Sequence, residues 1–207
     1  MEMAMRRLFL LLTSVLATLA VLGGCGPRRL PAAPADLAGL PFQPGQYVQE
    51  SYFAPNFKPD EVSYRFDPFT VAPDSDAPVE AFLETFQDEL VRAWVAQGLK
   101  VEQGNNACLL TGNIQRLSIK GGRLRWLTGR IHASLAISGA LTQGEQVLFA
   151  FRDQVNVSSP LAPGRAAPRE QELLLRQLAR ETIYHLLNEL LLHGATGESA
   201  RSAITRR

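Results

Sequence analysis

The sequence has little of several features on which functional assignments often depend. Its 207 residues include two cysteines and three histidines, and the 21 basic residues almost balance the 20 acidic ones. Two cysteines are too few for a scaffold held by several disulfides or for a zinc site of four thiolates. A chain without excess positive charge also lacks the electrostatic footprint of a nucleic-acid-binding protein, so we expect no nucleic-acid partner. The hydrophobic content of 46% is sufficient for one domain with a substantial core.

The common catalytic and nucleotide-binding motifs are also missing from the sequence. There is no Gly-x-Ser-x-Gly elbow, no Gly-x-Gly-x-x-Gly or Walker-type loop, and no His-Glu-x-x-His. Cys108 lies in an apolar segment with no histidine nearby in the sequence, which favours a small buried residue over a nucleophile. We therefore predict that the protein is not an enzyme and that it needs no cofactor.

Two groups of polar residues have spacings that also occur in metal sites. His185, Glu189 and His193 are four residues apart and can share one helix face, where they would suit zinc. A polar stripe on a helix explains the same pattern without a metal, and an enzyme would require these three side chains to converge on a cleft. Asp74 and Asp76 would suit calcium. No third ligand follows at alternate spacing, however, so helix capping explains them better. We predict no metal site.

The N-terminal residues have the layout of a secretory signal. Arg6 and Arg7 precede the apolar run LFLLLTSVLATLAVLGG, which ends in small residues and is followed by GPRRLPAAP. A membrane-spanning helix needs about 20 apolar residues and a flank that retains it. We therefore predict that residues 1–24 form a signal peptide that is removed.

The end of this segment, Leu22-Gly23-Gly24-Cys25, resembles the lipobox of bacterial lipoproteins. The resemblance implies that Cys25 receives a diacylglycerol, with acyl chains such as palmitate, and becomes the acylated N-terminus. An ordinary signal peptide with an incidental cysteine is the alternative. Several acyl chains anchor a protein stably. Gly26 stands where the sorting rule of these lipoproteins places aspartate for inner-membrane retention, which implies the outer membrane, with the domain facing the periplasm.

Residues 25–60 are predicted to be the lipidated cysteine and a proline-rich tether. Seven of the thirteen prolines lie between residues 26 and 59, and they deny this stretch a regular helix or a central strand. Its second half is too aromatic for a pure spacer, so we expect it either to pack on the domain or to dock a partner. The aromatic residues concerned are Phe42, Tyr47, Tyr52, Phe53 and Phe57.

Residues 61–193 are predicted to form an α+β domain, followed by a polar C-terminal tail over residues 194–207. Apolar residues with a period of three to four indicate one helix with Asp76 as its N-cap and a second helix that begins at Pro168 and is stopped by Gly194. Alternating apolar residues indicate strands over about 61–71, 99–101, 107–119, 130–141 and 147–157. This order predicts an antiparallel sheet of about four to five strands with both helices packed on one face.

Charge is distributed unevenly along the predicted domain. Residues 60–102 carry ten acidic side chains against three basic ones, whereas no acidic residue lies between Glu102 and Glu145. The second stretch predicts a basic hairpin end that binds an anionic partner, either a glycolipid or an envelope protein. A solvated hairpin complemented by the acidic helix is the alternative, with Trp126 as a stacked structural corner. The candidate partner-binding residues are Arg116, Lys120, Arg123, Arg125, Trp126 and Arg130.

The stretch LLTGNIQRLSIKGGRLRWLTGRIHASLAISGAL resembles a family of small Gram-negative envelope lipoproteins known as a domain of unknown function. Arg125, Trp126, Leu127 and Gly129 occupy the family's Arg-Trp/Tyr-Leu-x-Gly turn, although Arg130, Ile131 and His132 stand where members continue with a glycine-rich run. The resemblance implies a lipid-anchored periplasmic α+β domain without an established enzymatic activity. A looser likeness, of architecture only, is to lipoproteins of lipopolysaccharide export and auxiliary lipoproteins of lipid-transporting pumps.

These observations favour a non-catalytic, outer-membrane-anchored lipoprotein that acts as an accessory or assembly factor and binds an envelope protein or glycolipid. The alternative is a periplasmic domain that binds a small ligand or lipid in a pocket between the sheet and the helices. That pocket would be lined by residues such as Phe86, Leu135, Phe149 and Leu178.

Overall fold

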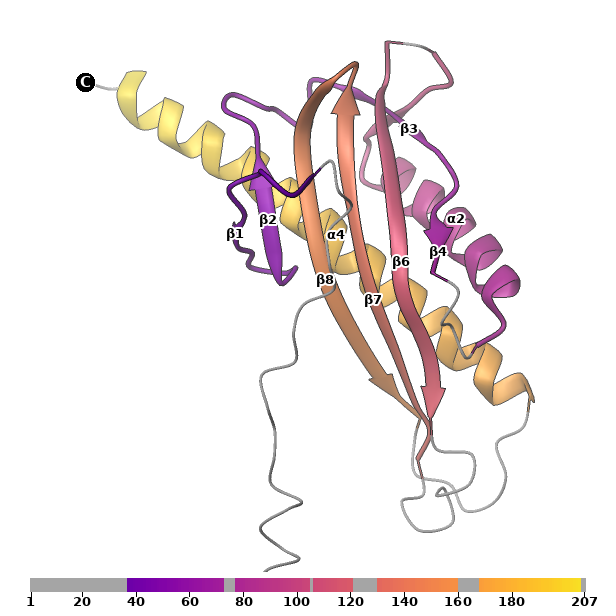
Figure 1. Ribbon diagram of the computed structural model, residues 1–207. Coiled ribbons are helices and arrows are strands. Elements are labelled where there is room, and N and C mark those ends of the chain that lie inside the picture. The colour runs from indigo at the N-terminus through magenta and orange to yellow at the C-terminus, as the bar shows by residue number, and fades with distance from the viewer. Residues whose placement is uncertain (1–36, 73–76, 105, 121–129, 160–167, 206–207) are drawn as a thin grey trace, which may run out of the picture. The chain divides into compact units, whose positions relative to one another are not determined.

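The chain folds into one open sheet with two helices packed on the same face (Figure 1). The computed structural model describes residues 37–72, 77–104, 106–120, 130–159 and 168–205. The strands are β1 (Gln43–Pro44), β2 (Glu50–Phe53), β3 (Ser63–Phe66), β4 (Thr70–Val71), β5 (Lys100–Val101), β6 (Cys108–Lys120), β7 (His132–Gln143) and β8 (Gln146–Ser158), and the helices are α2 (Val79–Ala96) and α4 (Pro168–Thr205). The predicted α+β class is therefore confirmed. Among the described residues, no helix is long and apolar enough to span a membrane.

The sheet has eight strands and is mixed, so the prediction of an antiparallel sheet of four to five strands is wrong in detail. The order is β1-β2-β8-β7-β6-β3-β5, and β4 also pairs with β6. β6, β7 and β8 form a long antiparallel meander. β3 runs parallel to β5 and to β6, and β4 is also parallel to β6. The helix α2 lies between β3 and β5 in the chain, and such a crossover allows neighbouring strands to be parallel.

The segment predicted as a single first strand is interrupted. β3 ends at Phe66, and β4 begins at Thr70 farther along the same edge of β6. Between them, the backbone N–H of Asp67 donates to the carbonyl of Leu110, so the segment stays attached to β6. Pro68 lies in this interval and has no N–H to donate to a ladder. The sequence pattern shows apolar alternation on both sides of the proline but not the break itself.

Two strands lie in the range that the sequence analysis placed in the tether. β2 pairs with β8 in an antiparallel register, and β1 pairs with β2 at the edge of the sheet. The aromatic second half of this range therefore packs on the domain, as one of the two interpretations predicted. Phe57 is buried, and Phe53 stacks on Phe149 with ring centroids 4.7 Å apart. A four-residue strand near the sheet edge avoids the conflict with proline that would exclude a central strand.

α4 continues through Gly194 to Thr205, so the predicted helix end at Gly194 is wrong. A glycine ends a helix when it adopts a left-handed conformation. The described glycines with positive φ are Gly98 and Gly144, and Gly194 is not among them. Gly98 follows α2, and Gly144 lies in the turn between β7 and β8, so the rule holds at those two positions.

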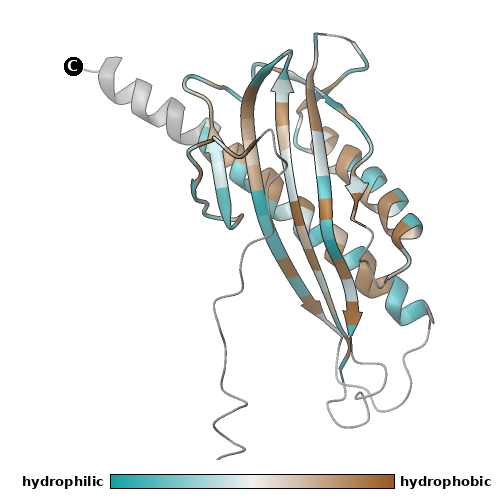
Figure 2. Ribbon diagram, viewed as in Figure 1, coloured by the Kyte–Doolittle hydropathy of each residue, from teal (hydrophilic) through white to brown (hydrophobic). Residues whose placement is uncertain are grey.

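The core lies between the helices and the sheet face that they cover. The side chains of α2 that enter it are Phe82, Phe86, Leu90 and Trp94, and all of them belong to the predicted apolar stripe. The hydropathy pattern of Figure 2 shows both helices carrying hydrophobic and hydrophilic faces. The predicted N-cap, Asp76, lies outside the described residues, and Pro78 precedes the first helical residue without a side-chain cap.

Candidate functional site

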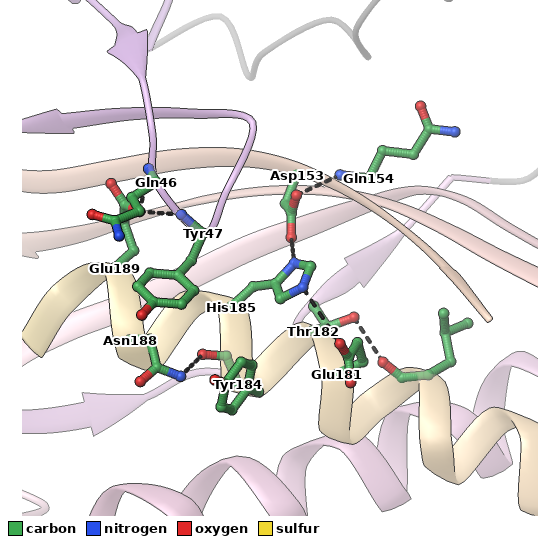
Figure 3. Close-up of polar contacts among 11 residues, drawn as sticks. Gln46, Tyr47, Asp153, Gln154, Glu181, Thr182, Tyr184, His185, Asn188 and Glu189 are labelled. Carbon is green, nitrogen blue, oxygen red and sulfur yellow. Dashed lines mark hydrogen bonds and ion pairs between the residues drawn. The ribbon is translucent and has the colours of Figure 1, made fainter. Parts of the chain in front are cut away.

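The polar stripe of α4 joins this helix to β8 and to residues 46–53. His185 Nδ1 lies 2.8 Å from Oδ2 of Asp153, a carboxylate that is 3% exposed on the helix-facing side of β8 (Figure 3). The other ring nitrogen of His185 lies 3.6 Å from the carboxylate of Glu181. The hydrogen bond to Asp153 raises the pKa of His185 above its ordinary value, against the lowering effect of burial. His185 therefore links α4 to the middle of the sheet.

Glu189 is one helical turn farther along and binds backbone rather than another charged side chain. Its carboxylate is 5% exposed and accepts hydrogen bonds from the backbone N–H groups of Gln46 and Tyr47, at 2.9 and 2.8 Å (Figure 3). The Ser51 hydroxyl donates to the same carboxylate at 2.8 Å. A buried carboxylate is costly unless hydrogen bonds satisfy it, and here they come from one short segment. We call residues 43–57 the strap, because Glu189 fastens this segment to α4.

His193 is the third member of the stripe and makes an aromatic contact. Its ring stacks on Phe53 of β2, with centroids 3.8 Å apart and planes at 4°. Burial lowers the pKa of His193, against the raising effect of the Glu189 charge. The stacking on Phe53 holds α4 against the same strap that Glu189 fastens.

The three side chains therefore do not share a ligand-binding point. His185 turns to β8, Glu189 to the strap and His193 to the Phe53 ring. Among the described residues, no group of three metal-ligating side chains has the proximity that a metal ion requires. Asp74 and Asp76, the other pair considered for a metal, lie outside the described residues.

Asp153 is the site residue that reasoning from the sequence missed. It occupies a position of β8 whose neighbours on the same face, Phe151 and Val155, are buried in the core. Asp153 Oδ1 accepts a hydrogen bond from the backbone N–H of Gln154 at 2.8 Å, while Oδ2 faces His185. The signal was present in the sequence, because an acidic residue in the apolar phase of a strand indicates a buried carboxylate that needs a partner.

The opposite face of the sheet, which we call the outer face, is not covered by the helices. Leu37, Ala140 and Ala150 form a small apolar cluster on part of it, with Phe42 packed alongside. Arg152 extends over the Phe42 ring at 4.2 Å and pairs with Glu50 at 2.9 Å. Small polar side chains lie farther along the same face. The hydroxyls of Ser118 and Ser134 lie 2.8 Å apart across β6 and β7.

Three of the predicted partner-binding residues lie at one end of the meander. Arg116 and Lys120 are exposed on the outer face of β6, and Arg130 is exposed just before β7. Glu89 of α2 forms an ion pair with Arg180 of α4, and Asp88 forms one with Arg92 of α2 itself. Among the described ion pairs, none joins α2 to Arg116 or Lys120. Arg123, Arg125 and Trp126 lie outside the described residues, as does Cys25.

The residues predicted to line an internal pocket are part of the packed core. Phe86, Leu135, Phe149 and Leu178 are each at most 1% exposed and belong to one contiguous hydrophobic cluster. Side chains around an open pocket would retain accessible surface, so these four do not surround one.

A groove of about 250 Å³ does lie between α2 and α4. Its apolar residues include Ala93, Ile183 and Leu187, and Tyr184 stands beside it with 54% of its surface exposed. The Glu89–Arg180 ion pair also lines this groove.

No family model matches the sequence, and no curated protein matches it either. Among solved structures, a Xanthomonas campestris protein of the DUF330 family has a similar fold. The TM-score is 0.50 and the sequence identity 11%, over 72% of this chain and 93% of that chain. The two proteins therefore share a fold.

Two further solved structures are more distant. A minor lipoprotein from Acinetobacter baumannii has a TM-score of 0.44 and 12% identity, over 63% of this chain and 92% of that chain. The rare lipoprotein B from Shewanella oneidensis has a TM-score of 0.40 and 15% identity, over 65% of this chain and 98% of that chain. Similarities at this level do not indicate the function of this chain.

Proposed function

We propose that this protein is a non-catalytic accessory lipoprotein, anchored to the outer membrane through lipid on Cys25, that binds an anionic envelope partner with the outer face of its sheet. The observation that carries the proposal is the charge of that face. Arg116 and Lys120 are exposed on it, and none of the side chains that β6, β7 and β8 place there is a carboxylate. The part of the face that these three strands build, which carries basic and no acidic side chains, favours an anionic partner, either a phosphorylated glycolipid or an acidic protein surface.

The point at which the described chain begins lies on the same outer face. Leu37, where the described chain begins, packs on the outer face against Ala140 and Ala150. The described chain therefore begins on the same face of the sheet that carries Arg116 and Lys120.

The anchor is tested first, by mass spectrometry of the protein extracted from membranes. We expect a mature N-terminus with lipid on Cys25, and we expect a Cys25→Ala variant to lose both the lipid and the membrane fraction. An unmodified chain recovered from the soluble periplasm would overturn the anchored part of the proposal.

The partner is tested by charge reversal at the candidate partner-binding residues. We test two double variants, Arg116→Glu with Lys120→Glu and, separately, Arg123→Glu with Arg125→Glu. In intact cells, each should abolish cross-linking of the domain to its phosphate-containing glycolipid or protein partner. Arg92→Glu with Lys100→Glu is the matched control, because it reverses two exposed charges elsewhere. Circular dichroism checks that all variants fold. Equal recovery of the partner by both test variants and the control would contradict the proposal.

A further inference from the structure

The edge of β8 that points away from β7 is paired with a described strand along only half of its length. β2 pairs with β8 from Phe149 to Arg152 and ends there, whereas β7 pairs with β8 as far as Ser158. Figure 1 shows β2 beside the first half of β8 and no labelled strand beside the second half. Within the described part of the chain, residues 153–158 thus have a strand neighbour on one side only.

The register identifies the backbone groups that this free edge presents. The N–H of Ser159 donates to the carbonyl of Ile131, toward β7. Because alternate residues of an antiparallel strand point their N–H and C=O groups to opposite edges, Gln154, Asn156 and Ser158 point theirs outward. The Gln154 N–H is taken by Asp153, and Asn156 is exposed. Such an edge is a template for a further strand.

We propose that this edge pairs with the same edge of a second copy of the chain, antiparallel and centred on Asn156. Two limits fix this register. β2 occupies the edge up to Arg152 in each copy, and β8 ends at Ser158. An antiparallel pair that fits between these limits places Asn156 opposite Asn156 of the second copy, and Gln154 opposite Ser158 of the second copy. Each Asn156 then donates its N–H to the other and accepts in return, which is an isologous contact with two-fold symmetry.

The residues of the free edge are compatible with a copy of themselves. The stretch from Gln154 to Ser158 reads QVNVS and carries no charge, so like charges do not face each other in the proposed pair. The segment of β6 from Arg116 to Lys120, which has no described strand on the side away from β7, differs, because Arg116 and Lys120 would bring like charges together there. The chain's own tether is a poor occupant, since residues 26–36 include three prolines, which have no N–H for a ladder.

The two-fold symmetry is also compatible with two lipid anchors in one membrane. The axis that relates antiparallel strands of one sheet is perpendicular to the sheet, so both outer faces remain on the same side. Leu37 lies on that face in each copy. The described part of each copy would therefore begin on the same side of the dimer. This last point rests on the proposed function, whereas the strand pairing does not.

Disulfide trapping tests the register in native membranes that contain the full-length protein. The Cα atoms of a hydrogen-bonded antiparallel pair are about 5.5 Å apart, which is within the range that a disulfide spans. Asn156→Cys should therefore form a covalent dimer on mild oxidation. Ser158→Cys alone should not, because in this register Ser158 faces Gln154, and the double variant Gln154→Cys with Ser158→Cys should form the dimer again.

The controls follow from the positions of the native cysteines. Cys108 is buried, so the parent protein should give no covalent dimer under the same conditions. Covalent dimer from Ser158→Cys but not from Asn156→Cys would overturn the register, and absence of dimer from all three variants would overturn the pairing. Covalent linkage of Asn156→Cys to a different protein alone would assign the edge to another partner and would also overturn it.

A charge variant tests the pairing without a new thiol. Asn156→Lys places two ammonium groups opposite each other, so the dimer seen by sedimentation of the detergent-solubilised protein should dissociate at least tenfold more readily. Asn156→Ser is the matched control and should leave the dimer intact. A wild-type protein that stays monomeric at every concentration would refute the proposal. The charge-reversal and anchor experiments above can fail independently of this result.

Discussion

The backbone N–H of Tyr47 donates a hydrogen bond to the carboxylate of Glu189, and the ring of Tyr47 packs edge-on against Tyr184 one turn earlier on α4. A segment that the prolines would leave irregular is thereby held in one position. Close packing beside this contact adds to the constraint, because a Cβ built at Gly45 would lie 2.6 Å from the carbonyl oxygen of Val48. The strap is therefore part of the folded domain, and its attachment depends on one buried carboxylate.

Replacement of Glu189 by alanine should destabilise the protein and loosen the strap. The change leaves the N–H groups of Gln46 and Tyr47 and the hydroxyl of Ser51 without their acceptor, which we expect to lower the free energy of unfolding by about 2–4 kcal/mol. Urea unfolding measures this loss. Limited proteolysis should show faster cleavage within residues 43–57. Glu181→Ala, at an exposed position of the same helix, should change both by much less, and equal effects of the two substitutions would argue against the clamp.

His185 should make a pH-dependent contribution to stability. Its pKa is raised in the folded protein, chiefly by the hydrogen bond to Asp153, so the folded state favours the protonated ring. This contribution is fully present below the unfolded pKa and is lost as the pH rises through the folded pKa. The difference in unfolding free energy between the wild type and His185→Gln should therefore be larger near pH 5.5 than near pH 9.

Comparison with His185→Gln separates His185 from the other titrating groups. His193 has a lowered pKa and opposes folding when it is protonated, but it is present in both proteins and cancels in the difference. The carboxylates of Asp153 and Glu181, which face His185, are also common to both. A difference that is constant across this pH range, or that grows as the pH rises, would contradict the assignment.

The parts of the fold that the sequence predicts are those with a strong local period. The meander of β6, β7 and β8 and the stripe of α2 follow from alternation and from three-to-four spacing. The pairing of β3 with β6 does not, because parallel neighbours are chosen by packing and not by local pattern. The stripe of His185, Glu189 and His193 was visible as a spacing, but its role depends on which segments lie opposite it. The strap was outside any periodic pattern, so those partners were not predictable.

Gly139 should tolerate no side chain, although its place in β7 looks unremarkable in the sequence. A Cβ at this position would lie 2.6 Å from the carbonyl oxygen of Thr111 and 2.7 Å from the ring of Phe151. The carbonyl belongs to the neighbouring strand and cannot move without disturbing the ladder, so Gly139→Ala should lower the unfolding free energy by about 1–3 kcal/mol. Gly104→Ala is the control, because nothing lies within 4 Å of its Cβ position. Thermal unfolding of both variants compares them directly.

Gly194→Ala should raise the free energy of unfolding rather than lower it. This substitution tests whether α4 continues past Gly194. A glycine inside a helix costs about 0.5–1 kcal/mol relative to alanine, so the substitution should stabilise the protein by up to that amount. Space is available, since the nearest atom to the added Cβ is 3.5 Å away on Pro59, an ordinary contact. If Gly194 instead ended the helix in a left-handed conformation, alanine would be strained there and the protein would lose stability. The matched control is Gly98→Ala, which should destabilise the protein because Gly98 has φ of 76° at the end of α2. Chemical unfolding of the two variants beside the wild type measures both changes in stability in one experiment. A loss of stability in both variants would show that the helix ends at Gly194.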